Sequence, residues 1–413
     1  MKILVMSQVF WPDSVAGSQH LTDLAEDMIA RGHTVRVITS KSNYENPKIK
    51  YPKSEVYQGV RITRINQTSF GKATKIGRVC NFISFTLFLL WELLAIREGE
   101  YEVIIGLTVP PMASFLGILI ARLKGMRFAY WVMDLQPELS IVAGYLKRES
   151  LAAKLLLRLG DFVYKKADAI IALDKYMASY ISHRAGVGIS DINVIPVWPV
   201  MNEVYLGPRL ENPFRQTNKI ADKIVVMYAG NHAVTHPLET LLQSALILKD
   251  DPRFLFVFIG GGVRKGDVTL FKEKYRLNNI LQLPYQERNT IHFSLGAADI
   301  HVVIQGDGCT GFTHPNKVYG AMFIGRPILY IGPDPSHITD LLGKCEGNIS
   351  RMHGEADILA RELRNFAETT ESERTTVGSR NMKYAQENLT RQKLSGQIIS
   401  VVEGLSSPAQ GGR

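Results

Sequence analysis

Short apolar strands alternate with amphipathic helices along this chain, and that alternation is the feature that most restricts the folds open to it. The first forty residues hold one complete cycle: an apolar strand over 2–7, a helix that starts at Gly17 and stops at Gly32, and a second strand over 34–39. Apolar residues recur on one stripe of that helix. A strand, a helix and a strand within about 35 residues form a βαβ unit, which implies a parallel sheet with a right-handed crossover.

The alternation runs in two series, which predicts two α/β domains. Between them, Pro196 to Lys223 contains four prolines and no regular period, which is typical of a linker. The second series opens with the apolar run IVVMYAG. We therefore predict a first domain over 1–200, a linker over 201–223 and a second domain over 224–383, each built on a parallel sheet, with the two sheets facing a cleft.

Composition excludes several classes of protein. With 413 residues, 46% of them hydrophobic and 21% charged, the chain is neither disordered, fibrous nor a polytopic membrane protein. Three cysteines stand far apart without a CxxC motif, so neither a disulfide scaffold nor a cysteine zinc site is expected. This favours a reducing cytoplasm. The apolar run after Met1-Lys2 is too short for a signal peptide.

The net charge of +9 is concentrated in one stretch, which suggests an anionic partner. From Lys41 to Arg78 there are nine basic and two acidic residues, a net charge of +7. The segment over 81–96, NFISFTLFLLWELLAI, follows it and is too short to span a bilayer. A solvated basic loop and a buried core helix are the alternatives. We predict that the 41–97 region contacts an anionic membrane surface, and not nucleic acid, because no binding fold or base-stacking motif accompanies the charge. The nine basic residues are Lys41, Lys48, Lys50, Lys53, Arg61, Arg64, Lys72, Lys75 and Arg78.

Two motifs in the first half point to a ligand site. Gly17 stands at the first strand-to-helix turn, where a glycine lets backbone approach a ligand and helix N–H groups suit a phosphate. The motif is not GxGxxG, and the glycine could simply permit the turn. Asp134 opens DLQPE just after the apolar strand FAYWVM. It could orient or deprotonate an acceptor hydroxyl, or serve only as a helix cap or ion-pair partner.

The second half has turns of the same kind at the ends of its strands. YAGNH follows the first strand, and a triple glycine ending at Gly262 follows the next, so Gly262, Arg264 and Lys265 are candidates for phosphate contact. A loop over 311–316 then runs into a helix that starts near Asn316. The N-terminal amides of that helix can hold a diphosphate, and Lys317 can neutralise it. The alternative for Lys317 is an exposed side chain that only packs along its helix.

Taken in order, these segments resemble glycosyltransferase family 4, in particular its bacterial surface-polysaccharide branch. The resemblance rests on the opening KILVMSQVFWPD with GSQHLTDLAEDMIARGHTVRVIT, then DLQPE, VIP, YAGN, HPNKVYGAMFIGRP and the final YAQENLTRQKL. It runs in register over nearly the whole chain. It implies a GT-B fold: two Rossmann-like domains, with a nucleotide-sugar donor held mainly by the second and an acceptor mainly by the first. It also implies that a C-terminal helix at about 384–405 packs back on the first domain.

The resemblance further implies a retaining reaction without a metal or other cofactor, in which helix dipoles and cations stabilise the leaving diphosphate. Lys317 matches the branch's P-S-K lysine, and Asp134 matches its D-L-W-P-E aspartate, with Gln136 in place of Trp. Gly17 matches the glycine turn near the donor phosphates. The expected catalytic residues are Asp134 and Lys317. The expected donor-binding residues are Gly17, Asn231, His236, Gly262, Arg264, Tyr285 (near the base), Phe312, Thr313, His314 and Lys317.

The sequence departs from the family in two places. The second glutamate of the E-x7-E motif, which is expected to hold the nucleotide ribose, falls on Gly320, and neither Thr310 nor Phe312 supplies the first. The family's arginine and lysine after the first strand of the second domain are replaced by Asn231 and His236. His236 is a weaker, pH-dependent cation, so phosphate neutralisation would shift to Lys317 and Arg264.

We therefore predict a metal-independent retaining glycosyltransferase of the hexosyl or N-acetylhexosaminyl type. Its donor would be a nucleotide-sugar, with UDP the family's commonest nucleotide, and its acceptor a lipid-linked or surface glycan. It would act in the cytoplasm, peripherally at the inner face of the membrane. The missing glutamates leave a second hypothesis, a catalytically silent protein that binds a nucleotide-sugar or supports a partner enzyme. A two-domain nucleotide-sugar epimerase fits the architecture but not the motifs.

Overall fold

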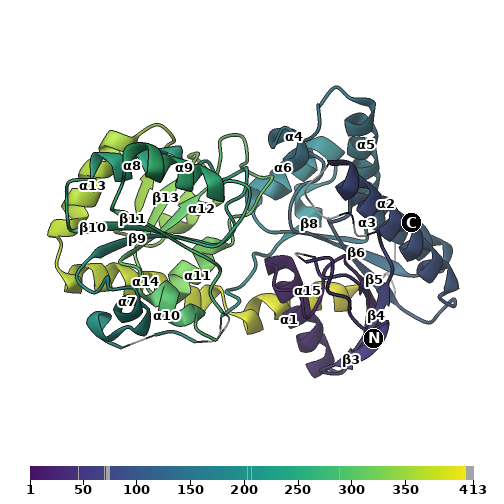
Figure 1. Ribbon diagram of the computed structural model, residues 1–413. Coiled ribbons are helices and arrows are strands. Elements are labelled where there is room, and N and C mark those ends of the chain that lie inside the picture. The colour runs from purple at the N-terminus through teal and green to yellow at the C-terminus, as the bar shows by residue number, and fades with distance from the viewer. Residues whose placement is uncertain are drawn as a thin grey trace. The chain divides into compact units, whose positions relative to one another are not determined.

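The computed structural model describes the chain except for residues 45, 69, 71–74, 202, 206, 288 and 406–413. The chain forms two compact units, each shown in Figure 1. Unit 1 contains Met1–Trp198, Gly311–His314 and the chain from Arg391 onward, and unit 2 contains Pro199–Thr310 and Pro315–Thr390. Each unit is built around its own β-sheet.

Unit 1 has a sheet of eight described strands, parallel except at one edge. The strand order is β3-β4-β2-β1-β5-β6-β7-β8, and only β3 runs antiparallel to its neighbour. Central strands such as β5 (VIIGL) are buried along their whole length, as strands covered on both faces must be. The bounds are β1 (Lys2–Met6), β2 (Thr34–Ser40), β3 (Ser54–Tyr57), β4 (Val60–Ile65), β5 (Val103–Leu107), β6 (Arg127–Val132), β7 (Ala169–Ala172) and β8 (Ile192–Val194).

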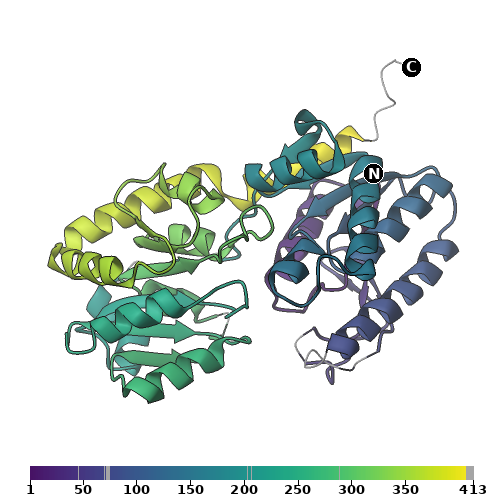
Figure 2. The same cartoon turned by 90° about the horizontal axis from the view of Figure 1, so that it is seen from above.

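The helices of unit 1 cover both faces of this sheet. The chain moves from β1 to β2 in one direction along the sheet and from β4 onward in the other, so right-handed crossovers place α1 on one face and α2, α3, α5 and α6 on the opposite face. α15 packs beside α1, whereas α2, α3, α5 and α6 contact one another in sequence (Figures 1 and 2). The bounds are α1 (Ala16–Ala30), α2 (Lys75–Ala95), α3 (Pro111–Leu123), α4 (Glu138–Val142), α5 (Leu151–Lys166), α6 (Lys175–Ala185), the 3-10 turn η1 (Ile189–Asp191) and α15 (Arg391–Gly404).

One cation of the 41–97 region does not lie at the surface. Arg64, counted among the surface cations, is buried: its guanidinium pairs with Glu55 and donates to the carbonyl oxygen of Trp11 at 2.8 Å. Lys72 lies outside the described residues, as do the side chains of Lys75 and Arg78. The other basic residues described between 41 and 61 are exposed or partly exposed, so the membrane contact of this region stays a prediction. None of the helices in the described part of the chain combines the length and apolarity needed to cross a bilayer.

Unit 2 has a parallel sheet of six described strands in the order β11-β10-β9-β12-β13-β14. Its apolar core lies between this sheet and the helices that follow each strand. The strands are β9 (Ile224–Ala229), β10 (Phe254–Ile259), β11 (Ile280–Leu283), β12 (Ile300–Ile304), β13 (Ile328–Ile331) and β14 (Ile349–Arg351). The helices are η2 (Arg209–Glu211), α7 (Pro213–Thr217), α8 (Glu239–Ile247), α9 (Lys265–Tyr275), α10 (Ile291–Gly296), α11 (Lys317–Ile324), α12 (His337–Leu342), α13 (Ala356–Glu368) and α14 (Glu371–Asn388).

The segment predicted as a linker over 201–223 is a folded part of unit 2. It contains η2 and α7, and two of its arginines bind one buried carboxylate: Arg209 lies 2.8 Å and Arg215 2.5 Å from Asp299. Asp299 also accepts from the main chain of Val225 at 2.7 Å, and its pKa is lowered by the two guanidinium groups against the opposing effect of burial. Because side chains far along the sequence hold this segment, its irregular composition did not indicate a free linker.

The C-terminal helix α15 belongs to unit 1, whereas α14 lies in unit 2. Arg391, the first residue of α15, forms ion pairs with Asp23 (2.9 Å), Glu26 (2.9 Å) and Asp27 (2.7 Å) of α1. Asp23 also accepts a hydrogen bond from the Trp198 indole at 2.8 Å. One arginine thus compensates three carboxylates on a helix that precedes it by more than 360 residues.

Candidate functional site

Asp134 lies just past the carboxyl end of β6, where parallel α/β sheets bind their ligands. Burial raises the pKa of its carboxyl to about 7, against the opposing effect of a hydrogen bond from the main-chain N–H of His314. A carboxyl with a pKa near neutrality can hold a hydroxyl group or exchange a proton with it at physiological pH. Asp134 does not cap α4, whose N-cap is Pro137, so the helix-cap alternative does not apply.

The short segment Gly311–His314 belongs to unit 1. The carbonyl oxygen of Phe312 accepts from the main chain of Leu135 at 2.9 Å, and the Phe312 ring meets the Tyr180 ring edge to face, with centroids 4.8 Å apart. Gly311 has a φ of +77°, and a Cβ there would lie 3.0 Å from the carbonyl oxygen of Tyr176. This segment, predicted as donor-binding, therefore contacts the loops that surround Asp134.

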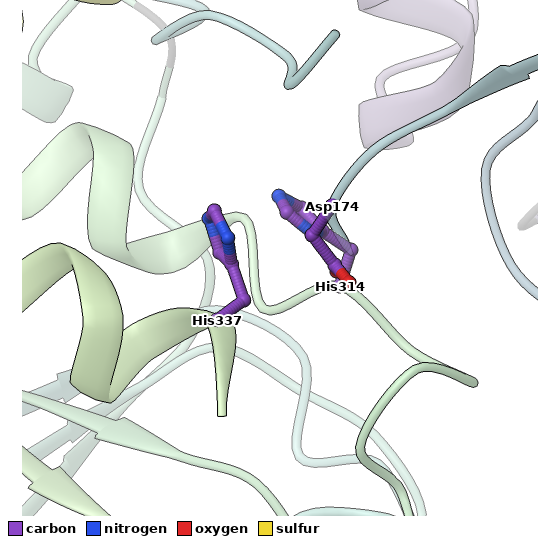
Figure 3. Close-up of side chains that lie close together, drawn as sticks. All are labelled: Asp174, His314 and His337. Carbon is purple, nitrogen blue, oxygen red and sulfur yellow. The ribbon is translucent and has the colours of Figure 1, made fainter. Parts of the chain in front are cut away.

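His314 is held by a buried carboxylate, Asp174 (Figure 3). The imidazole Nδ1 lies 2.8 Å from Asp174 Oδ2, and both side chains are almost fully buried. A carboxylate only accepts hydrogen bonds, so Nδ1 carries the hydrogen. The other Asp174 oxygen accepts from the main chain of Met177 at 2.8 Å and caps α6. Asp174 thus links the start of α6 to the residue whose main chain contacts Asp134.

A second histidine lies near this group. His20, in α1, is buried, and its ring meets the Trp198 ring edge to face, with centroids 5.4 Å apart. Burial, and to a lesser extent the charge on His314, lowers the pKa of His20 to about 3, so its imidazole is neutral at physiological pH. The sequence analysis named neither His20 nor Asp174.

Gly17 lies in the first turn of α1, at the same carboxyl edge of the sheet. The N-cap residue, Val15, makes no side-chain hydrogen bond to the first turn, so its side chain caps none of the first amides. A Cβ added at Gly17 would meet no atom of the described chain within 4 Å, and its φ is not positive. Nothing in the described part of the protein therefore requires glycine at this position.

In unit 2, Lys317 is the first residue of α11 and packs against the end of β9. Its Nζ lies 5.3 Å from the centroid of the Tyr228 ring, and a Cβ at Gly230 would lie 2.8 Å from its Cε. Burial lowers the pKa of Lys317 to about 8, which leaves it mostly protonated at neutral pH. The N-cap residue Asn316 does not bond the amides of the first turn through its side chain.

His236 and Asn231 lie on the other side of Tyr228. The Tyr228 hydroxyl donates to the carbonyl oxygen of Asn231 at 2.9 Å and lies 3.0 Å from His236 Nδ1. Burial and the nearby charge of Lys317 hold the pKa of His236 well below its usual range. His236, predicted as a weaker, pH-dependent cation, therefore offers hydrogen bonds and not charge at neutral pH.

The two glycine turns of unit 2 lie against each other. Gly262 has a φ of +128°, and a Cβ there would lie 2.4 Å from Asn231 Oδ1 and 2.7 Å from the carbonyl oxygen of His232. The ring of Tyr285, half exposed, lies over Gly260 and Gly261. Glycine is required here because two main-chain turns approach closely beside an aromatic ring.

Arg264 is placed near these turns, but its charge is already compensated. Its guanidinium lies 3.1 Å from Glu239 and 2.9 Å from Asp267. At the position of the missing family glutamate, a Cβ on Gly320 would contact only the sulfur of Met201, at 3.8 Å. Lys317 is therefore better placed than Arg264 to neutralise an anion.

The predicted site residues thus form two groups, one in each unit. In unit 1 the structure brings Asp134 together with the 311–314 segment, and Gly17 lies at the same edge of the sheet. In unit 2 it brings Lys317 together with Asn231 and His236, while the turn at Gly262 lies against Asn231. The residues that sequence reasoning missed, His20 and Asp174, had no local signal, because their partners are distant in sequence.

The sequence of unit 1 matches a known domain family. Residues 16–198 match the glycosyl transferase 4-like domain. The chain is 29% identical over 265 residues to "Probable glycosyltransferase WbjE" of Pseudomonas aeruginosa, which is 63% of this chain and 65% of that protein, so the match spans slightly less than two thirds of that relative. It is 22% identical over 339 residues to WcaI of Escherichia coli strain K12, whose assigned name refers to colanic acid biosynthesis, covering 79% of this chain and 82% of that one.

The architecture matches a solved structure along nearly its whole length. HepE of Anabaena, solved in complex with UDP, superposes with a TM-score of 0.72, covering 98% of this chain and 100% of that one at 14% identity. At this identity the likeness concerns the fold. It establishes the GT-B fold that the resemblance implied, with one α/β sheet in each unit, parallel throughout in unit 2 and parallel except for β3 in unit 1.

Proposed function

We propose that this chain is a member of glycosyltransferase family 4 and that it transfers a sugar from a nucleotide-sugar to a lipid-linked or surface-glycan acceptor. The nucleotide is proposed to be UDP, which HepE holds in its solved structure. The transferred sugar is proposed to be a hexose or N-acetylhexosamine. The reaction would retain the anomeric configuration and would need no metal, and the protein would lie peripherally at the inner face of a membrane.

The observation that carries this proposal is the environment of Lys317. Its ammonium stands at the start of α11, where helix N–H groups and the helix dipole add positive potential, and it is partly withdrawn from water. A leaving diphosphate develops negative charge in the transition state, and a preorganised cation in a low-dielectric site stabilises that charge most. Tyr228 and Gly230 fix the side chain in place.

Asp134 is proposed to position the acceptor hydroxyl. In a front-face reaction the leaving phosphate can itself take the proton of the acceptor, so a strong general base is not required. A carboxyl with a pKa of about 7 can accept a hydrogen bond from the acceptor hydroxyl in its ionised form. The hydrogen bond from the main-chain N–H of His314 orients that carboxyl.

A thermal-shift screen tests the donor assignment. A nucleotide that binds only the folded protein raises its melting temperature. UDP, GDP, dTDP, ADP and CMP are compared on the wild type, on Lys317→Ala, and on Lys249→Ala as a surface control in unit 2. We expect UDP to stabilise the wild type and the control but not Lys317→Ala. Stabilisation of all three proteins by the same nucleotide would contradict the role of Lys317.

A catalytically silent protein is the second candidate function, and it is favoured by Gly320 at the glutamate position and by the ion pairs of Arg264. The two functions differ in turnover. If UDP-sugar binds but no sugar reaches a membrane-extracted lipid acceptor, and no UDP is released, the silent function holds. UDP release that depends on both the acceptor and Lys317 supports the enzyme.

A further inference from the structure

Three neighbouring helices of unit 1 leave a broad row of large apolar side chains uncovered. On α2, Phe85, Leu89 and Leu93 are buried against the unit. The side chains of Ile83, Leu87 and Trp91 each come two residues before one of these and point away from the unit. Trp91 is 76% exposed. The exposed apolar residues are Val79, Ile83, Leu87, Phe88, Trp91 and Leu94 on α2, Met112, Leu119 and Leu123 on α3, and Leu151 and Leu155 on α5.

The three helices run side by side on one face of the sheet. Lys124, just after α3, donates to the carbonyl oxygen of Leu94 near the end of α2 at 2.8 Å, and Arg122 donates to that of Lys166 at the end of α5 at 2.7 Å. These contacts join the C-terminal ends of all three helices, which Figure 2 shows in a row. We name this surface the α2–α3–α5 face. Uncovered apolar surfaces of such extent mark interaction sites.

α5 adds positive charge to the same surface. Leu151, Lys154, Leu155 and Arg158 follow the spacing of one helix face, so cations and leucines point outward together. Lys147 and Arg148 are exposed just before this helix. Within the described part of the chain, none of these four cations forms an ion pair with a carboxylate.

We propose that the α2–α3–α5 face docks on a bilayer of anionic phospholipids. Leucine and tryptophan side chains would enter the headgroup and acyl boundary while the α5 cations meet the anionic headgroups, which is how interfacial helices bind. A second copy of the chain fits less well, because an isologous contact through this face would bring the α5 cations of both copies together. The proposal keeps the apolar α2 of the 41–97 region and adds α3, α5 and the α5 cations, which the sequence analysis did not name.

The position of the α2–α3–α5 face adds to the proposed function, and the biological role of this face rests on that function. The N-terminal ends of α3 and α5 lie at the carboxyl edge of the sheet, the edge at which Asp134 stands. Between Asp134 and α5 the chain exposes two further apolar side chains, Val142 and Tyr145. A lipid-linked acceptor anchored in the bilayer would therefore reach the edge of unit 1 that holds the acceptor-positioning residue.

Vesicle sedimentation tests this surface without any activity assay. The full chain is mixed with phosphatidylcholine vesicles, with and without phosphatidylglycerol, at low and high salt. We expect binding only to the anionic vesicles, weakened by salt. Two double variants of α5 should each weaken partitioning of the protein onto these vesicles by about tenfold or more. One is Leu151→Gln with Leu155→Gln, and the other is Lys154→Gln with Arg158→Gln. The matched controls on α9 of unit 2, Leu270→Gln and Lys272→Gln with Lys274→Gln, should leave partitioning within about twofold.

Two outcomes overturn the proposal: equal binding by the face variants and the controls, or no binding to anionic vesicles together with a dimer that the face variants dissociate. Circular dichroism confirms that each variant is folded. The donor screen separates this proposal from the function. If the vesicles bind but no nucleotide does, the transferase assignment fails while the docking surface stands. If UDP binds equally to wild type and face variants but the vesicles do not bind, only the docking surface fails.

Discussion

Lys317 holds its ammonium 5.3 Å from the centre of the Tyr228 ring, with its Cε packed against the main chain of Gly230. The contact is a cation–π pair at the first residue of a helix, partly shielded from water. A lysine in this position is already oriented before an anion arrives. Its charge, however, depends on pH within the physiological range.

Nucleotide affinity should fall as pH rises past 8. The pKa of Lys317 is lowered to about 8 in the folded protein, so its positive charge is present below that pH and lost above it. The UDP dissociation constant should rise by up to about tenfold per pH unit above pH 8. Calorimetric titration over this range checks it. Lys317→Arg retains its charge and should remove the pH dependence, and a slope unchanged in that variant would contradict the assignment.

Gly230→Ala should weaken both stability and nucleotide binding. Gly230 has a φ of +121°, and its Cβ would lie 2.8 Å from Lys317 Cε. We expect a loss of about 1–3 kcal/mol in the free energy of unfolding and weaker UDP binding, because Lys317 must move. Gly266→Ala is the matched control: it lies in α9, has no positive φ, and its Cβ would meet nothing within 4 Å. Denaturant titration and UDP binding on both variants decide the point.

Asp134→Asn should change the pH dependence of stability as well as activity. Folding raises the pKa of this carboxyl from 3.8 to about 7, so the protonated form favours the folded state. The wild type should lose of the order of 3 kcal/mol relative to the variant as pH rises from 4 through 7, because the stabilising proton is released and each pKa unit is worth about 1.4 kcal/mol. Denaturant midpoints at several pH values measure this. Parallel stability curves for the two proteins would show that Asp134 has an ordinary pKa.

The same variant should lose activity with a distinct profile. Wild-type kcat/KM should rise between pH 6 and 8 as Asp134 ionises. Asp134→Asn should lose about 100-fold or more and should lack that limb. An unchanged limb in the variant would assign it to another group.

Gly17→Ala should separate stability from binding. The Cβ has room, and alanine favours a helix over glycine by about 0.5–1 kcal/mol, so the variant should fold at least as stably. If the space beside Gly17 receives a ligand, UDP-sugar turnover should fall by about tenfold or more, since a methyl group would occupy it. Gly396→Ala in α15, also without a neighbour within 4 Å, should gain stability without losing turnover.

Arg391→Ala should destabilise unit 1. The change leaves Asp23, Glu26 and Asp27 close together without their shared cation. We expect a loss of about 2 kcal/mol, allowing for the partial exposure of the group, and a melting temperature lower by about 4–8 °C. Lys249→Ala, an exposed lysine in unit 2, should change it by less than about 0.5 kcal/mol. Calorimetry on the two variants compares them.

Much of the fold could be predicted from local sequence, because the apolar periods of strands and helices are set by residues that are close together in the chain. The hairpin of β3 and β4 is an exception: its tight turn lies at Gln58 and Gly59, both with positive φ. Gln58 gives no signal for such a turn, since glutamine rarely adopts that conformation. The folded linker segment was missed for another reason: Asp299 holds it from about ninety residues away.

The candidate site was predictable where a motif lies within one loop and its helix, as with Lys317. It was not predictable where burial sets the chemistry. The neutral state of His236, the raised pKa of Asp134 and the compensated charge of Arg264 all depend on tertiary packing. The pairing of Asp174 with His314 spans 140 residues, and a single sequence carries no sign of such a partnership.

The membership of α15 in unit 1 bears on how the protein is made. A ribosome releases β1 to β8 first, then all of unit 2, and only afterwards the helix whose Arg391 compensates the acidic side of α1. Unit 1 therefore reaches its final packing after unit 2 has been synthesised, although most of it emerges earlier. A nascent chain halted before Arg391 would carry an uncovered α1 with three uncompensated carboxylates, and a gene fragment ending at Trp198 would have the same defect.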